Sequence, residues 1–255
     1  MFNHIRTIAR YTLLEALRNR LSWLILVVAL AGIGISGFLY EIALTEKTEL
    51  QLTLLSALLR FSAVFLVATF VVTSMVREIN DKGLQLVLAM PVTRAGYLLG
   101  KLTGFALISL LPVAIFGALI GTLAPVATCL MWALSLCAEL WIVAAFSVLC
   151  VLTFSQVMPA LFSVMGFYVM ARSIAALQLM GHQPLLEKTP SQRVINAMLD
   201  TLSALLPHLD RFTRSDWLVY GGIDWHAMAL LGTQSVIYLA LLCGAALFDM
   251  YRKNI

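Results

Sequence analysis

Apolar residues along the chain are grouped into six long runs, and polar residues or prolines separate each run from the next. A helix of about 20 apolar residues crosses the hydrocarbon core of a bilayer, and each run is long enough to do so. The predicted spans are Leu21–Tyr40, Leu54–Val76, Leu98–Leu123, Val126–Phe154, Met158–Leu179 and Ala227–Phe248. The pattern predicts one all-α polytopic membrane domain over residues 1–255, with six transmembrane helices.

The stretch before the first span has a helical pattern of its own. Within residues 1–20, three arginines lie off an apolar stripe that recurs at helical spacing. The stripe comprises Ile5, Ile8, Ala9, Thr12, Leu13, Ala16 and Leu17, and the arginines are Arg6, Arg10 and Arg18. A basic amphipathic helix of this kind is expected to lie in the membrane interface. A plain extension of the first span is the alternative.

The segment 181–225 is the longest stretch without a span. Thr189 and Pro190 have the order of an N-cap followed by proline at the first helical position. An apolar stripe from Val194 to Leu206 follows and ends at Pro207. We expect an amphipathic helix that lies on the outer leaflet or caps the helix bundle, and it could offer a docking surface to an extracytoplasmic protein.

The stretch Arg77–Leu102, REINDKGLQLVLAMPVTRAGYLLGKL, joins the second and third spans. A short helix from Lys82 to Ala89 is expected, because Pro91 disfavours helix in the residue before it. Thr93 is the expected N-cap of the next helix, which continues through Lys101 into the third span. A helix of about eight residues is marginal in water, so its apolar side needs a partner surface.

The end of this stretch, GYLLGKL, is not a nucleotide-binding loop. A Walker A motif needs G-x-x-x-x-G-K-[ST] after a strand, and here Ala95 and Leu102 occupy the first glycine and the Ser/Thr positions. Lys101 is instead expected to anchor its span at the headgroups.

Composition and charge restrict the class of protein and its orientation. Only 12% of the residues are charged, against about 25% in soluble domains, so a soluble globular fold is excluded. The four cysteines lie inside apolar runs without paired or metal-type spacing, so neither a disulfide framework nor a zinc site is expected. Lys and Arg concentrate before the first span, between the second and third, and after the last. Both termini are therefore expected in the cytoplasm.

The order of these segments resembles the permease subunit of ABC-2 type ABC transporters. NHIRTIARYTLLEALRNRLSW stands where that family has its elbow helix, and the charged, apolar, Pro-Val-Thr-Arg, Gly-Lys progression is similar to its cytoplasmic coupling segment, here residues 77–97. LLPHLDRF, Leu205–Phe212, resembles the branch linked to multicopper enzyme and nitrous oxide reductase maturation. No cluster of Cys, Met or His marks a copper route, which makes copper a doubtful cargo.

The resemblance implies a non-catalytic subunit of a bacterial inner-membrane exporter. Its partners would be an ABC ATPase, a second permease copy and membrane lipid. The ATPase would hold the ATP and magnesium. No nucleic-acid partner is expected, and no cofactor is expected in this chain. The ATPase contact would fall on Asp81, Lys82, Leu84, Gln85, Val87 and Leu88, flanked by Arg77 and Glu78. The alternative is an ATP-driven scaffold or mechanotransmitter that acts on an extracytoplasmic maturation partner without moving cargo.

Three charged residues interrupt the predicted spans, namely Arg60, Glu139 and Arg172. At about 1.5 Å per residue they lie roughly 21 to 24 Å from the inner ends of their helices, so they share one layer. Charges in hydrocarbon are costly and usually find a partner. We therefore expect Glu139 to pair with Arg172, Arg60 or both. The cluster could lock the bundle, act as a gate or polar cargo contact, or let Arg60 reach the headgroups.

A membrane-embedded enzyme is the other class of function to consider. The four histidines are isolated from one another, and no His-x-x-x-His or Glu-x-x-His pair occurs in a span. Glu139 has no second carboxylate in its layer for acid–base work. The sequence therefore favours a non-catalytic subunit.

Overall fold

The computed structural model describes residues 2–19, 21–42, 47–81, 93–181, 190–222 and 225–252, and their regular elements are all helices. The elements are α1 (Phe2–Arg18), α2 (Leu21–Ile42), α3 (Lys47–Asn80), α5 (Arg94–Ile120), α6 (Val126–Phe154), α7 (Val157–Gly181), α8 (Pro190–Leu205), η1 (Leu209–Arg211), α9 (Asp216–Val219) and α10 (Trp225–Arg252).

Six of these helices, α2, α3, α5, α6, α7 and α10, are long and apolar enough to cross a membrane. They coincide with the six predicted spans, so the predicted all-α, multi-pass architecture is confirmed. The largest difference is in α3, which starts seven residues before the predicted Leu54.

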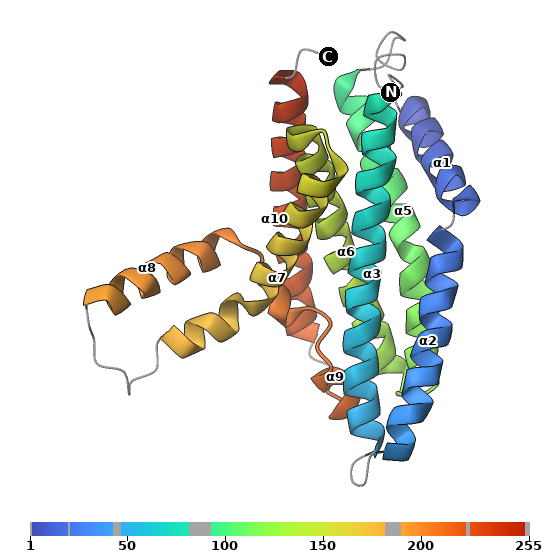
Figure 1. The fold of residues 1–255 in the computed structure, drawn as a ribbon, viewed down its shortest axis with the longest axis vertical. Helices are drawn as coiled ribbons and strands as arrows, with labels where there is room; N and C mark the ends of the chain where they lie inside the picture. The colour runs from blue at the N-terminus through green and yellow to red at the C-terminus, as the bar shows by residue number, and fades with distance from the viewer. Residues whose placement is uncertain are drawn as a thin grey trace.

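The bundle is arranged around α6 (Figure 1), which packs against α3, α5, α7 and α10. The apolar window of α6 is the most buried of the six, whereas those of α2, α7 and α10 are mostly exposed. These outer helices present large apolar side chains, including Leu30, Phe162 and Leu241. Such side chains are suited to lipid rather than water.

Local sequence signals set the ends of these helices. The Thr93 hydroxyl accepts a hydrogen bond from the Gly96 N–H at 3.1 Å, so the predicted N-cap is confirmed. At the far end of α6, Ser155 takes a left-handed conformation with φ of 56°, and its N–H donates to the Val151 carbonyl. This residue lies at the reversal of the chain between α6 and α7.

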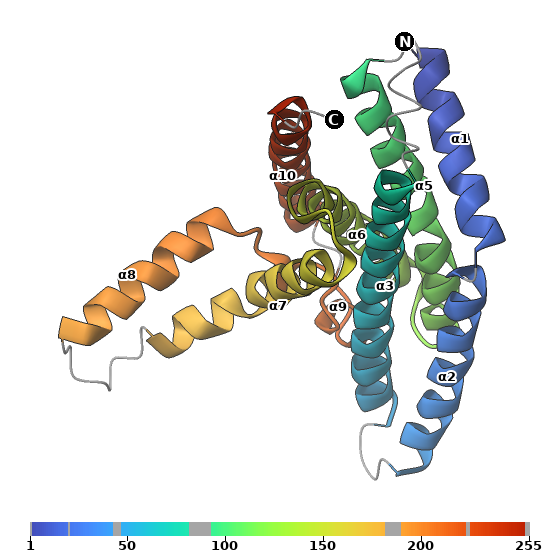
Figure 2. The same ribbon diagram turned by 45° about the horizontal axis from the view of Figure 1, so that its top comes forward.

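Helix α1 packs along α5, and Figures 1 and 2 both show the two helices side by side. Its predicted apolar stripe is largely covered by protein, with Ala9, Thr12 and Ala16 buried. Much of the stripe thus packs on α5, and the placement of α1 in the membrane interface stays a prediction. Close approach depends on two glycines of α5, because a Cβ at Gly100 or Gly104 would lie 2.9 Å or 2.8 Å from α1 side-chain atoms.

Helix α8 forms as predicted, with Pro190 in its first position. It does not cap the bundle. It pairs with the end of α7, and the two project from the bundle as an arm in both views (Figures 1 and 2). Gln178 joins them, because its amide donates to Asp200 and accepts from the Ser203 hydroxyl, each at 3.1 Å. The arm thus stands beside the bundle and leaves the bundle interior to the chain that follows it.

Candidate functional site

The three intramembrane charges are brought together from three different helices. Arg60 comes from α3, Glu139 from α6 and Arg172 from α7. The Arg172 Nη1 lies 3.3 Å from the Glu139 Oε1, and the glutamate is fully buried. The ion pair that the shared depth predicted is therefore confirmed. Arg60 forms no ion pair with Glu139 in the described structure, so that alternative pairing is wrong.

These charges bind a segment of the chain itself. Residues 206–219, here called the inserted segment, follow the arm and turn back against α3, α6 and α7. Leu209, Phe212 and Leu218 anchor it in the apolar core. The segment contains η1 and α9, which Figure 1 shows beside α3 and below α7. The outer segment therefore reaches into the bundle instead of only covering it.

Arg172 binds the inserted segment mainly through backbone carbonyls. Its Nη1 lies 2.8 Å from the Leu209 oxygen, 3.2 Å from the Phe212 oxygen and 3.3 Å from the Thr213 hydroxyl. A charged donor strengthens such hydrogen bonds. One guanidinium therefore balances the Glu139 carboxylate and holds the turn of the inserted segment.

Thr213 is the residue at which the cluster converges. Its hydroxyl donates to the Glu139 Oε2 at 2.6 Å, its N–H donates to the Ser135 hydroxyl at 2.9 Å, and its carbonyl accepts from the Arg60 Nη1 at 3.0 Å. The side chain is fully buried. Every polar group of Thr213 is thus bound by a different bundle residue.

The backbone of Thr213 is strained, with φ of 43°. A β-branched residue rarely adopts this left-handed conformation, and such strain persists only where surrounding contacts enforce it. The three bonds from α3 and α6 supply that constraint here. The inserted segment is therefore held in a conformation it would leave if the cluster opened.

Arg60 binds the inserted segment, a role that its depth in the membrane did not predict. Its guanidinium points to Thr213 rather than to the headgroups, so the headgroup alternative is wrong. Its Nε is buried and has no hydrogen-bond partner in the described structure. Tyr168 of α7 lies within interaction range of Arg60 and Glu139. The Arg60 Nε–H is thus a buried hydrogen-bond donor without an acceptor among the described residues.

Sequence reasoning missed the polar residues that complete this site. Ser135 is a short polar residue in an apolar helix, Thr213 lies in a segment without an apolar run, and nothing in their spacing marks either residue. Ser56 of α3 and Ser215 of the inserted segment form a further contact, with their hydroxyls 2.9 Å apart. The available signal was the irregular mixture of apolar and polar residues in LLPHLDRFTRSDW, which fits neither the helical nor the strand period.

A second polar site ties together the ends of α3 and α5, the two helices that residues 82–92 connect. Lys101 of α5 forms an ion pair with Glu78 of α3, and its side chain is only 7% exposed. The expectation that Lys101 extends to the headgroups is therefore wrong, because the ammonium is turned inward to a carboxylate. We call this ion pair, together with the hydrogen bond between Ser74 and Glu15 described next, the clasp.

The clasp also includes α1. The Ser74 hydroxyl of α3 donates to the Glu15 Oε1 of α1 at 2.9 Å. Tyr97 of α5 is buried beside Glu78 and Glu15. Three helices are therefore joined through polar groups at the end of the bundle that holds both termini (Figure 1).

The predicted ATPase-contact residues are only partly visible. Arg77 and Glu78 form the last turn of α3, and Asp81 follows it with its N–H donating to the Arg77 carbonyl. Lys82, Leu84, Gln85, Val87 and Leu88 lie outside the described residues, as does the predicted short helix. Their contact with an ATPase stays a prediction.

The cysteines add no further site. Cys129, Cys137 and Cys150 lie in α6 and Cys243 in α10, all as free thiols. Within the described ranges, no group of three His, Cys, Asp or Glu residues could hold a metal ion. That the chain itself carries no cofactor stays a prediction.

Comparison of the chain with protein-family models and with curated proteins finds no match.

Proposed function

We propose that this chain is the membrane subunit of an ABC-2 type transporter. A separate ATPase subunit would bind its cytoplasmic side and drive it, and the chain would pair with a second copy of itself or with a sister chain. Both termini would lie in the cytoplasm of a bacterial cell, and the complex would export its cargo. Two observations support this proposal, namely the six apolar helices and the clasp between the helices that residues 82–92 connect.

The clasp is the observation that carries the proposal. Residues 82–92 connect α3 to α5, and the ion pair between Glu78 and Lys101 ties those two helices together close to the segment. The bond between Ser74 and Glu15 adds α1 to the same unit. A force applied to the segment would therefore move three helices together rather than bend one loop.

Helix α3 supplies the connection to the inserted segment. Arg60 precedes Glu78 by 18 residues on this one helix, a distance of roughly 27 Å at about 1.5 Å per residue. Arg60 and Ser56 both form hydrogen bonds with the inserted segment. A rigid rotation or shift of α3 would therefore strain or break those hydrogen bonds. This gives ATP-driven motion at one end a physical route to the other.

The test uses the complex isolated through an affinity tag on this chain. Leu84→Asp or Leu88→Asp should leave the chain inserted but remove the apolar ATPase contact. We expect vanadate-sensitive ATP hydrolysis in the tagged complex to fall at least ten-fold, the scale of about 1.4 kcal/mol of lost contact.

Asn80→Asp is the matched control, because it adds one negative charge at the end of α3 beside the segment. It should retain ATP hydrolysis. Parental hydrolysis in both leucine variants would contradict the coupling role. Failure of the parent chain to co-purify with any ATPase would contradict the proposed function itself.

The mechanotransmitter alternative is favoured by one observation, the arm of α7 and α8. Arg172 lies on α7, and the inserted segment follows α8 directly. Movement of the charge cluster would therefore swing the arm, which carries exposed Val194, Ile195 and Met198. An arm that moves an extracytoplasmic partner would need no cargo path.

A cross-link can decide whether the inserted segment must move. The Ser56 and Ser215 hydroxyls are 2.9 Å apart, so Ser56→Cys/Ser215→Cys places two thiols within reach of a disulfide. If the segment acts as a gate or transmitter, oxidation should abolish ATP-driven activity, and reduction with dithiothreitol should restore it. Each single cysteine variant is the control. Full activity of the cross-linked chain would show that the cluster only locks the bundle.

A further inference from the structure

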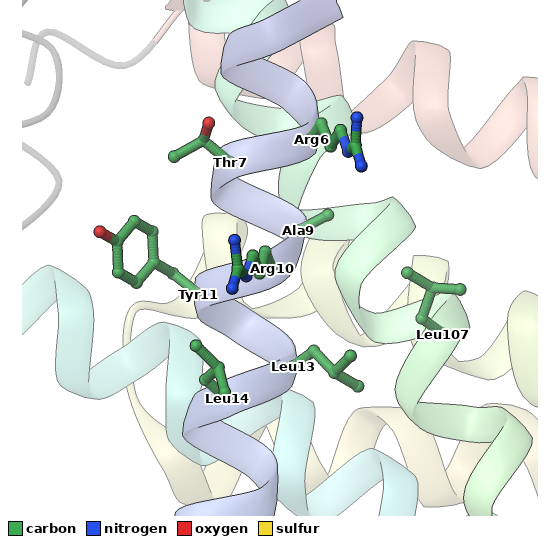
Figure 3. A pocket seen from close by; sticks show the side chains of 8 residues that line it. All are labelled: Arg6, Thr7, Ala9, Arg10, Tyr11, Leu13, Leu14 and Leu107. Carbon is green, nitrogen blue, oxygen red and sulfur yellow. The ribbon is translucent and has the colours of Figure 1, made fainter.

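A cavity of about 650 Å³ lies between α1 and α5 (Figure 3). Seven of its lining residues lie along α1, and Leu107 of α5 completes it. Its volume falls within the range of roughly 300 to 1,000 Å³ that is usual for ligand sites. Gly100 and Gly104 allow α1 to approach α5 closely beside this cavity.

The cavity carries positive charge without a compensating carboxylate. Arg6 and Arg10 both line it and stand four residues apart on α1, and Figure 3 shows the two side chains on successive turns of the helix, with Arg6 nearer its N-terminal end. Neither arginine forms an ion pair with any residue that the structure describes. Among the described residues, no Asp or Glu lines the cavity. The site is therefore complementary to an anion.

Polarity changes along the length of the cavity. Arg6 and Thr7 lie toward the N-terminal end of α1, and Leu13, Leu14 and Leu107 lie toward its other end (Figure 3). Leu107 follows Lys101 of the clasp by six residues, about 9 Å farther along α5 at 1.5 Å per residue. The charged end thus faces the side of the termini, and the apolar end faces the middle of the bundle.

A second cavity of about 690 Å³ continues past Tyr11 and Leu14, which line both cavities. Arg18 and Arg77 lie in it. Among the described residues that line it, Glu15 is the only carboxylate beside the two guanidinium groups, so the lining keeps a net positive charge. The same side of α1 is therefore cationic along its whole length.

We propose that the cavity between α1 and α5 binds an anionic phospholipid of the leaflet on the side of the chain termini. The lipid phosphate would lie between Arg6 and Arg10, and its acyl chains would run over Leu13, Leu14 and Leu107. The order of charged and apolar groups in the cavity matches the order of headgroup and tail in a lipid. This site does not depend on any ATPase partner.

The test measures lipid binding to the purified full chain in detergent by native mass spectrometry. Dioleoylphosphatidylglycerol should bind and dioleoylphosphatidylcholine should not compete for it. Each arginine near a membrane surface contributes a factor of about five to binding of anionic lipid. Arg6→Gln/Arg10→Gln should therefore weaken phosphatidylglycerol binding about 10- to 30-fold, while Arg6→Lys/Arg10→Lys should retain most of it.

Two controls make the result specific. Arg252→Gln removes an exposed cation from the end of α10 at the same side of the molecule and should leave binding unchanged. Inorganic phosphate at millimolar concentration should not displace the lipid, because it lacks the acyl chains that Leu13 and Leu107 would contact. Equal binding of phosphatidylcholine, unchanged binding by the glutamine variant, or displacement by phosphate alone would each overturn the proposal.

Discussion

Arg172→Met is expected to destabilise the protein by about 3 to 5 kcal/mol, the usual result of removing one partner of a buried ion pair. The substitution leaves the Glu139 carboxylate buried without its nearest cation. It also removes the donor that holds the carbonyls of Leu209 and Phe212. The strained Thr213 backbone then loses part of its support, so the inserted segment should open. Titration with sodium dodecyl sulfate measures the stability, and hydrogen exchange of residues 206–219 measures the opening.

Arg214→Met is the matched control, because it removes a cation from the same segment. The Arg214 pair with Asp216 has side chains 51% and 58% exposed, and exposed pairs contribute about 0 to 1 kcal/mol. Its stability and exchange should remain near those of the parent. Equal losses in the two variants would contradict a special role for the buried cluster.

The charge swap Glu139→Arg/Arg172→Glu separates pairing from segment binding. A carboxylate at position 172 can still face an arginine at position 139, but it cannot donate to the carbonyls of Leu209 and Phe212. We expect the swap to recover part of the stability lost by the single changes while hydrogen exchange in the inserted segment stays fast. A swap that recovers nothing would show that Glu139 and Arg172 are not the important pair.

The spans and several of their ends could be predicted because short-range patterns determine them. Runs of about 20 apolar residues gave all six helices, and the cap at Thr93 needs only the neighbouring Gly96. The Glu139–Arg172 pair was also predictable. A buried charge needs a partner, and helical rise placed both residues at one depth.

The inserted segment could not be predicted, because its conformation comes from tertiary contacts. Residues 206–219 have no apolar run and no period, and Thr213 adopts a backbone conformation that its own propensity opposes. The partners of Thr213 are distant in the chain, since Glu139 is 74 residues away, Ser135 is 78 and Arg60 is 153. Only the assembled bundle brings these groups to one point.

Packing of α1 and the position of Lys101 were missed for a related reason. Gly100 and Gly104 predict close approach by some helix, but glycines are common in membrane helices and do not identify the neighbour. Lys101 stands where an interfacial anchor is expected. Its actual partner, Glu78, is 23 residues away, and the pairing depends on how α3 and α5 align.

Glu78→Gln is expected to destabilise the protein by about 3 kcal/mol, because it leaves the nearly buried Lys101 ammonium without its carboxylate. This value is at the lower end of the range for a broken buried pair, since the Glu78 side chain is 20% exposed and water can reach it. Detergent-induced unfolding checks the stability. In the tagged complex, vanadate-sensitive ATP hydrolysis should fall as well, because α3 and α5 would no longer move as one unit.

The double variant Glu78→Gln/Lys101→Met distinguishes stability from coupling. Methionine in place of Lys101 removes the unpaired buried charge, and replacing a buried ion pair by apolar groups of similar volume is often neutral for stability. The double variant should therefore regain most of the stability lost by Glu78→Gln, while ATP hydrolysis stays low because nothing ties the two helices that flank residues 82–92. Recovery of both stability and hydrolysis would mean that the Glu78–Lys101 pair stabilises the fold but does not transmit force from residues 82–92.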